Sequence, residues 1–535
     1  MSAKQDTNGP AEAGVAIRVR PDLGPWASPR QTVRRATVLG SGTMGSQIAA
    51  LLADQGIPCD LLDLPSDEGK NRLAEEGKRR LSTLRPPPLY SADSLGLIRV
   101  GNFSDDLARV AEADWVVEAV AENLDIKRKL WAQVAPHLRP GVIVSTNTSG
   151  IPIASIAEAL PPELRSRFMG THFFNPPRYL RLMELIPWSG SDPAVVAAMS
   201  RFTEYVLGKG VVTAHDVPNF VGNRIGTYGL MVTLRAMEEF GLGPDEVDSI
   251  TGPAMGRPNS ATFRTLDLVG LDVLVAVCDN MRGYLTEQRE RDGFEVPQYL
   301  RDLIQRGWIG EKTRQGFFKR IVADGETQIH VLQPDSFEYR PRRSLRAPSL
   351  AAVRDIEDPG VRLRTLVGSD DVAGRFAWRI LSQVLVYAAE KVGEISDDII
   401  SIDRAMQWGY GWELGPFETW DALGVTDTIE RMQADGQAVP EWVKELGKEG
   451  KGFYRHQAQG SLQATPQSTY AVVPESERAI PIHRLRAANR AIVQRPGTSL
   501  YDLGDGVAFL DFHSPKQAIG PDLLEMLDEA ATLVS

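Results

Sequence analysis

The sequence predicts an α/β domain with an open, mostly parallel sheet, followed by two tandem all-helical domains. Two observations lead to this prediction. In the first part of the chain, short apolar runs alternate with amphipathic segments, which is typical of a parallel sheet with helices on both faces. Further along, the pattern becomes helical, and one stretch of sequence recurs in a later part of the chain.

The first domain opens with a strand at Ala36–Leu39 and a helix that ends near Gln55, and a second apolar run ends at Asp63. The strand and the helix are joined by a glycine-rich turn that consists of Gly40, Ser41, Gly42, Thr43, Met44 and Gly45. A strand, a glycine turn, a helix and an acid at this spacing form the fingerprint of a dinucleotide-binding, Rossmann-type unit.

Each part of this fingerprint has a physical role. Gly40 permits the tight turn, Gly42 lets the backbone approach a pyrophosphate, and Gly45 lets the helix pack against the strand. The helix N-terminus offers free N–H groups to phosphates. The Asp63 carboxylate can accept hydrogen bonds from a ribose 2′-hydroxyl, and no arginine follows it to hold a 2′-phosphate. The sequence therefore favours NAD over NADP as the cofactor.

Composition and charge exclude several classes of protein. The chain has 535 residues, of which 42% are hydrophobic and 24% charged, with a net charge of -11. An acidic balance argues against nucleic acid or an anionic membrane as the main partner, and no apolar run is long enough to span a bilayer. Cys59 and Cys278 form no disulfide or metal pattern. We therefore expect a cytoplasmic protein with no metal site and no integral membrane segment.

The later elements of the first domain follow in order. A charged helical stretch at Asp67–Leu84 includes Lys78, which lies either on a solvated face or against the phosphates of a ligand. Further elements are expected as strands at Ile98–Val100, Trp115–Ala119 and Val142–Ser145 and as a helix at Lys127–Leu138.

A long helix, Phe220–Phe240, opens the helical part, and Val247–Asp272 within that part resembles Ile400–Val425. The repeat predicts a second helical domain of the same kind. The expected units are a flexible tail (1–34), the Rossmann domain (35–216), the first helical domain (217–320), a linker (321–370), the second helical domain (371–456), a second linker (457–480) and a C-terminal segment (481–535).

Three polar stretches stand out as candidate site residues. The sequence STNTSG at 145–150 follows a strand, where ligands bind in open α/β sheets, although such a cluster can also cap a helix. NFVGNR at 219–224 begins the long helix, where an amide can point into a cleft or cap the helix. In a hairpin centred near Arg178, His172 and Glu184 would lie opposite each other. A carboxylate in an apolar strand is costly unless paired, so a buried pair is expected, either catalytic or purely structural.

Together these stretches resemble the L-3-hydroxyacyl-CoA dehydrogenase family. The matching segments are GSGTMG at 40–45, VVEAVAENLDIK at 116–127, STNTSG at 145–150, GTHFFNP at 170–176, LMELI at 182–186 and NFVGNR at 219–224. The resemblance implies NAD-dependent oxidation of an L-3-hydroxyacyl-CoA to a 3-ketoacyl-CoA in fatty-acid β-oxidation. The sequence leaves open a related dehydrogenase of a non-CoA hydroxy acid and a catalytically idle NAD-binding scaffold.

By position, the resemblance implies His172 as the general base and Glu184 as its orienting partner. Ser149 and Asn223 would contact the substrate's C3 oxygen. Histidine exchanges protons near neutral pH, and a carboxylate fixes its tautomer. Neutral donors can hold the oxygen without trapping an alkoxide. These residue types therefore suit removal of a hydroxyl proton as hydride leaves the same carbon.

The resemblance also implies cofactor contacts. Asn147 would lie near the nicotinamide, Glu122 and Lys127 would contact the cofactor, and Lys78 is a candidate contact to CoA. The chain departs from the family pattern at two positions, because the family commonly has glycine in place of Asn219 and serine in place of Gly150. Both changes are expected to alter the shape of the acyl pocket.

Within the C-terminal segment (481–535), residues 500–531 resemble the first hairpin and helix of an enoyl-CoA hydratase (crotonase) domain, which larger fatty-acid oxidation proteins join to this dehydrogenase. The hydratase catalytic segments are not reached, so no hydratase activity is expected. The segment is either a truncation or a relic. The expected partner is an acyl-CoA substrate; a thiolase partner is left open, as are a monomer with an internal pseudo-dimer and a homodimer.

Overall fold

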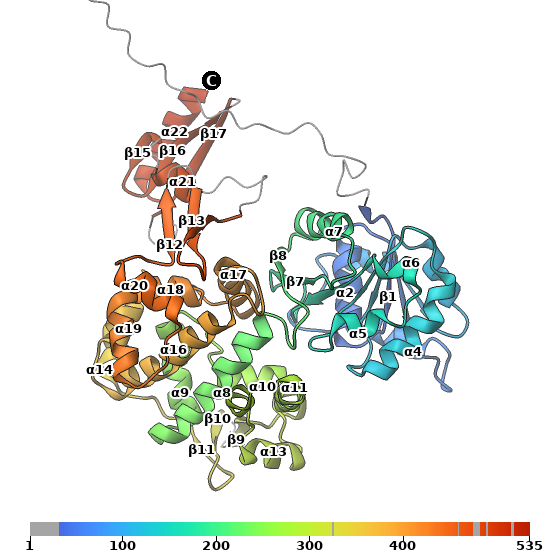
Figure 1. The fold of residues 1–535 in the computed structure, drawn as a ribbon, viewed down its shortest axis with the longest axis horizontal. Helices are drawn as coiled ribbons and strands as arrows, with labels where there is room; N and C mark the ends of the chain where they lie inside the picture. The colour runs from blue at the N-terminus through green and yellow to red at the C-terminus, as the bar shows by residue number, and fades with distance from the viewer. Residues whose placement is uncertain are drawn as a thin grey trace, which may run out of the picture.

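The computed structural model describes residues 32–534, except 324–325, 458–459, 475–481, 488–490, 505 and 515–517. Most of the expected flexible tail, residues 1–31, lies outside the described residues. Figure 1 shows an N-terminal α/β domain beside a larger group of helices, with a small C-terminal unit next to strands β12 (Tyr454–Gln457) and β13 (Gly460–Ala464).

The N-terminal domain is built on an eight-stranded sheet of order β3-β2-β1-β4-β5-β6-β7-β8. Its strands are β1 (Ala36–Leu39), β2 (Cys59–Asp63), β3 (Ile98–Asn102), β4 (Trp115–Glu118), β5 (Ile143–Thr146), β6 (Phe168–Phe173), β7 (Leu182–Ile186) and β8 (Gly210–Thr213). All neighbours are parallel except β6 and β7, which form an antiparallel pair. The predicted Rossmann-type sheet is therefore confirmed, and β1 and β4 flank the crevice where the strand order reverses, the usual ligand site of such sheets.

Helices cover this sheet. They are α2 (Thr43–Asp54), α3 (Arg72–Arg80), α4 (Leu124–Val134), α5 (Ile153–Ala157), α6 (Pro162–Arg165) and α7 (Pro193–Tyr205). The close packing of α2 on β1 depends on glycine, because a Cβ on Gly45 would lie 1.9 Å from the carbonyl oxygen of Gly40. The sequence prediction identified β1 to β5, α2, α4 and the β6–β7 hairpin but not α7 or β8.

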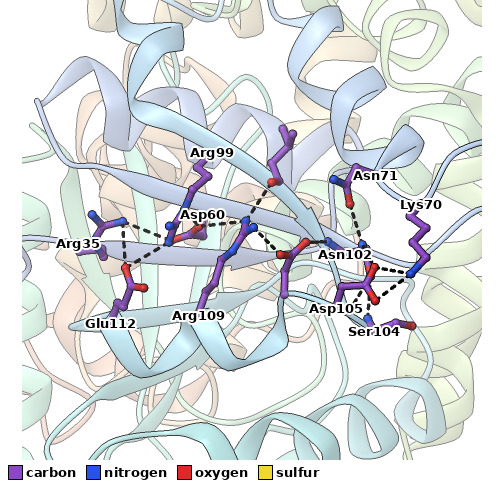
Figure 2. Close-up of polar contacts among 12 residues, drawn as sticks. Arg35, Asp60, Lys70, Asn71, Arg99, Asn102, Ser104, Asp105, Arg109 and Glu112 are labelled. Carbon is purple, nitrogen blue, oxygen red and sulfur yellow. Dashed lines mark hydrogen bonds and ion pairs between the residues drawn. The ribbon is translucent and has the colours of Figure 1, made fainter.

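Charge holds the outer strands β2 and β3 together (Figure 2). The fully buried carboxylate of Asp60 accepts hydrogen bonds of 2.5 and 2.9 Å from the guanidinium of Arg99. Arg35 and Arg109 complete the cluster, with guanidinium nitrogens 3.4 and 3.8 Å from the carboxylate oxygens of Asp60. A buried carboxylate is costly unless it is paired, so these arginines stabilise the strand that ends at Asp63.

The helical part has two groups. The first group is α8 (Gly222–Phe240), α9 (Pro244–Thr251), α10 (Phe263–Val269), α11 (Leu271–Tyr284), α12 (Gln288–Gly293) and α13 (Gln298–Gln305). The second is α14 (Pro348–Val353), α15 (Pro359–Val367), α16 (Val372–Lys391), α17 (Ile399–Tyr410), α18 (Pro416–Leu423), α19 (Val425–Ala434) and α20 (Glu441–Lys448). The long helices α8 and α16 pack against each other, with Tyr228 stacked on Tyr387 at 3.8 Å between ring centroids. Within the described residues, no helix is long and apolar enough to cross a membrane.

A small antiparallel sheet follows each group. The strands are β9 (Phe318–Ala323), β10 (Glu326–Gln333) and β11 (Glu338–Pro341) in one sheet, and β12 (Tyr454–Gln457), β13 (Gly460–Ala464) and β14 (Tyr470–Val472) in the other. Asp267 accepts hydrogen bonds from the N–H groups of Phe317 and Phe318, and Asp421 accepts them from those of Phe453 and Tyr454. Burial raises the pKa of both aspartates to about 6. We call this pair of hydrogen bonds, from a buried aspartate to two successive N–H groups, an aspartate clamp. It occurs at corresponding positions of the two groups.

These small sheets and helices α14 and α15 correct the expected linkers at 321–370 and 457–480, and they also correct the expectation that the helical domains are all-helical. Apart from β13, these strands are mostly exposed, and their polar sequence resembles that of a loop. Val331 and Leu332 of β10 are fully buried, however, and Gln463 of β13 uses its buried side chain to accept a hydrogen bond from the N–H of Ile400. A polar composition therefore concealed ordered structure.

The C-terminal unit has a sheet of its own, and its helix α21 (Ile482–Ala487) contacts β12 of the second small sheet. The unit also comprises β15 (Ala491–Arg495), β16 (Thr498–Gly504), β17 (Val507–Phe512) and α22 (Pro521–Val534). The three strands form an antiparallel sheet on which α22 packs.

Candidate active site

The glycine turn lies between β1 and α2 and is held from both sides. The Asp63 carboxylate accepts hydrogen bonds from the N–H and the hydroxyl of Ser41, at 2.6 and 2.5 Å. Arg80 of α3 donates to the carbonyl of Ser41 at 2.8 Å. Gly42 and Thr43 are exposed, so the first N–H groups of α2 are open to a ligand. An open helix N-terminus beside a carboxylate fits the pyrophosphate and ribose of a dinucleotide.

A buried ion cluster supports the loop after β5. Lys127 is 1% exposed, and its ammonium lies 2.7 Å from Glu118 and 3.3 Å from Glu122. Glu122 in turn accepts hydrogen bonds from the Thr148 hydroxyl and the Ser149 N–H. Burial opposes ionisation of Glu122, but these partners outweigh it and lower its pKa. In the structure, Glu122 and Lys127 therefore hold the loop that carries Ser149; sequence reasoning did not identify Glu118.

The predicted pairing of His172 with Glu184 is confirmed. The two residues are direct partners in the β6–β7 register, and Nδ1 of His172 lies 2.6 Å from a carboxylate oxygen of Glu184. On the other side of the ring, Nε2 lies 3.1 Å from the hydroxyl of Ser149. His172 is 3% exposed and Glu184 is fully buried. A carboxylate that accepts from Nδ1 leaves Nε2 as the proton acceptor, as in catalytic triads.

Helix α8 completes this arrangement. The second carboxylate oxygen of Glu184 accepts hydrogen bonds from the N–H groups of Val221 and Gly222, at 3.0 and 2.7 Å. These donors belong to the first turn of α8, where backbone N–H groups lack partners within the helix. The helical part therefore fixes the acid that orients His172.

Aromatic rings cover the histidine. Phe174 and Phe220 pack against the His172 ring, with centroids 4.7 and 5.6 Å away. Nearby, the side-chain oxygen of Asn147 accepts a hydrogen bond of 2.9 Å from the N–H of Phe173. The ring is therefore largely shielded from water except toward Ser149.

Asn223 follows Gly222 in the first turn of α8. Its side-chain oxygen accepts a hydrogen bond of 3.1 Å from the hydroxyl of Tyr410, which lies at the end of α17. Burial raises the pKa of Tyr410, so its hydroxyl stays protonated and donates. The bond fixes the amide orientation of Asn223. No sequence signal could identify Tyr410, because it is distant in the chain and its neighbours resemble any helix end.

We expect Tyr410→Phe to lower kcat about 10-fold because the Asn223 amide loses its orienting donor. Steady-state kinetics and the melting temperature of each variant would measure this effect. Tyr470→Phe is the matched control, since it removes a hydroxyl that donates to the Gly452 carbonyl far from the site. Equal activity of both variants would contradict the assigned role of Tyr410.

Lys78 lies apart from these residues. Its ammonium donates to the carbonyl of Ile98 at 2.7 Å, which ties α3 to β3. The structure thus brings Ser149, His172 and Glu184 into one hydrogen-bonded chain, with Asn223 adjoining it. Within the described residues, no cluster of three or more His, Cys, Asp or Glu side chains is arranged to hold a metal.

Comparisons with known proteins agree with this geometry. Residues 35–217 match the family described as "3-hydroxyacyl-CoA dehydrogenase, NAD binding domain", and residues 220–320 match "3-hydroxyacyl-CoA dehydrogenase, C-terminal domain". The N-terminal domain is therefore an NAD-binding domain.

Curated relatives extend the match. A "Probable 3-hydroxyacyl-CoA dehydrogenase" of Bacillus subtilis is 44% identical over 511 residues, which is 92% of this chain and 64% of the relative. A protein of the same name from Deinococcus radiodurans is 45% identical over 54% of this chain and 83% of its own length. This chain therefore spans less than two thirds of the Bacillus relative.

Among solved structures, 3-hydroxybutyryl-CoA dehydrogenase of Escherichia coli K12 aligns with a TM-score of 0.59. The alignment covers 78% of this chain and 99% of the other, at 23% identity. At that identity the likeness bears on the fold alone.

Proposed function

Because the chain belongs to the 3-hydroxyacyl-CoA dehydrogenase family, we propose that it oxidises an L-3-hydroxyacyl-CoA to the 3-ketoacyl-CoA with NAD, as a step of fatty-acid β-oxidation. The observation that carries this proposal is the hydrogen-bonded chain Ser149–His172–Glu184 beside an open dinucleotide turn. Such a chain supplies a base where a secondary alcohol would lose its proton.

Bound NAD supplies the hydride acceptor for this reaction. In the proposed mechanism, Nε2 of His172 takes the proton from the C3 hydroxyl. Glu184 holds Nδ1 and stabilises the imidazolium that forms. Ser149 and Asn223 bind the C3 oxygen as neutral donors, and Phe174 and Phe220 keep water away from the base.

The direct test measures NADH formation with 3-hydroxybutyryl-CoA and with a long-chain 3-hydroxyacyl-CoA. Turnover with NAD supports the proposal, and the ratio of the two rates reports the preferred chain length. Absence of turnover with every CoA ester, in a protein that still binds NAD, would contradict it and favour a non-CoA hydroxy acid or a scaffold.

We assign NAD selectivity to Asp63, whose carboxylate lies at the end of β2 against the glycine turn. Asp63→Ser should raise KM for NAD about 10-fold or more, because the ribose hydroxyls lose a charged acceptor. It should also raise the relative rate with NADP, since repulsion of a 2′-phosphate disappears. Asp105→Ser, which changes an exposed aspartate at the neighbouring edge, is the control. An unchanged ratio of NADP to NAD activity would contradict the assignment.

The two helical groups are, in this proposal, copies of one module that each comprise a long helix, shorter helices and a small sheet. Their matching aspartate clamps support this interpretation. Because α16 packs on α8, the second copy occupies the place that a partner subunit would take. The proposal therefore expects a monomer, and light scattering that shows an obligate dimer would contradict it.

The crotonase-like identity of the C-terminal unit is also part of this proposal. We assign β16, β17 and α22 to a crotonase-like opening on the sequence resemblance, and a thiolase partner is likewise proposed only for assemblies of the fatty-acid oxidation type. Neither assignment enters the mechanism. The proposed catalytic residues all lie between Ser149 and Asn223, and the hydrogen bond from Tyr410 to Asn223 comes from helix α17, before the C-terminal unit.

A further inference from the structure

Asn219 has a buried amide with an unused donor. The residue is 1% exposed, and its Nδ2 has no hydrogen-bond partner among the described residues. Its backbone is left-handed at φ 59°, and Phe220 follows at φ 50°. Buried polar groups in native proteins are nearly always paired, and backbone strain of this kind gathers at functional sites. An unpaired donor in such a place indicates a partner that arrives with a ligand.

The position of this amide points to the ligand. A Cβ on Gly150 would lie 3.0 Å from Oδ1 of Asn219 and 2.9 Å from Nδ2 of Asn280. The side chain of Asn219 therefore lies over Gly150 with its oxygen nearest, in space that a side chain there would crowd. Gly150 directly follows Ser149, which contacts His172.

The other neighbour of Asn219 also belongs to the site. Phe220 packs its ring on His172, and the next two N–H groups, of Val221 and Gly222, hold Glu184. Asn219 thus adjoins both the loop that carries Ser149 and the segment that fixes the base. The two amides near Gly150 make this flank of the site polar, whereas the flank with Phe174 and Phe220 is apolar.

We propose that Asn219 determines specificity for a thioester by donating from Nδ2 to the thioester carbonyl oxygen of the substrate; this inference rests on the proposed function. An L-3-hydroxyacyl-CoA carries two oxygen atoms near the reacting carbon. In the proposed mechanism, Ser149 and Asn223 bind the C3 oxygen and His172 takes its proton. One methylene separates the carbon of the thioester carbonyl from C3. The Asn219 amide lies beside Gly150, the residue that follows Ser149. The unused donor and the remaining acceptor therefore match.

Asn219→Gly tests the inference, because glycine tolerates the left-handed backbone and removes the side chain that carries the amide. The substrates are 3-hydroxybutyryl-CoA and its thioether analogue, in which a methylene replaces the thioester carbonyl. We expect the variant to lose about 10- to 100-fold in kcat/KM on the thioester, mainly through KM, because the bond exists in ground and transition states alike. Activity on the thioether should hardly change, so the preference for the thioester shrinks by the same factor.

Asn219→Asp is a second variant of nearly the same shape, and it also tolerates a left-handed backbone. It replaces the donor by an acceptor and should reduce the thioester preference at least as strongly. Ser468→Gly is the matched control, since it makes the same backbone change at another left-handed residue, φ 58°, away from the site. This control should leave kcat/KM unchanged on both substrates.

The outcomes separate the inference from the proposed function. Wild-type turnover with a thioester preference that Asn219→Gly and Asn219→Asp both leave intact would overturn the role of Asn219 alone. A wild-type enzyme that turns over no 3-hydroxyacyl-CoA would overturn the proposed function together with the inference. A merely structural role of Asn219 would lower activity on both substrates equally and is therefore distinguished by the ratio.

Discussion

Replacing His172 with alanine should lower kcat by about 10²- to 10⁴-fold, the range that a positioned general base contributes. The side chain removed is the one whose Nε2 lies 3.1 Å from the Ser149 hydroxyl, and no other titratable side chain is hydrogen-bonded to that hydroxyl within the described residues. Binding of NAD should persist, because the glycine turn and Asp63 belong to other strands. NADH formation gives kcat, and quenching of protein fluorescence by NAD gives the binding constant.

His137→Ala is the matched control for this experiment. His137 is exposed at the end of a short turn after α4, away from the β6–β7 hairpin. Its loss should leave kcat unchanged. A His172→Ala enzyme that keeps the wild-type kcat would contradict the proposed mechanism, whatever the substrate.

Glu184→Gln should lower kcat by about 10³- to 10⁴-fold, as happens when the orienting acid of a triad becomes an amide. The glutamine oxygen can still accept from the N–H groups of Val221 and Gly222, so its amide N–H₂ faces Nδ1 of His172. Nδ1 then becomes an acceptor, and Nε2 carries the proton that it should receive. The variant should fold, because both helix N–H groups keep their acceptor.

Glu184→Ala provides the contrast. It leaves the two N–H groups of α8 buried without an acceptor, which costs about 1–3 kcal/mol for each group. The alanine variant should therefore melt well below the glutamine variant, while both lose activity. Wild-type kcat in Glu184→Gln would show that the carboxylate serves only to hold the helix.

The sequence could predict what rests on local pattern. The glycine turn with Asp63 and the His172–Glu184 register follow from alternation and spacing within one short stretch, and both are present in the structure. Pattern could not identify Tyr410, because its contact with Asn223 joins two distant helices.

Composition misled the prediction where buried residues are polar. Gln463 and the polar strands of the small sheets gave a loop-like sequence, and Glu118, at the end of the apolar strand β4, is buried against Lys127 from the charged start of α4. In each case the partner that makes burial tolerable comes from another element. Such partners become visible only in three dimensions.

In the proposed mechanism, the two N–H groups at the start of α8 that hold Glu184 make catalysis depend on both domains. The histidine, the acid and the serine all belong to the NAD-binding domain, yet the acid is fixed by a helix that begins the next domain. A freely expressed NAD-binding domain would contain every named base and acid and still have them poorly aligned. In the proposed mechanism, the alignment of His172 therefore depends on folding across the domain boundary.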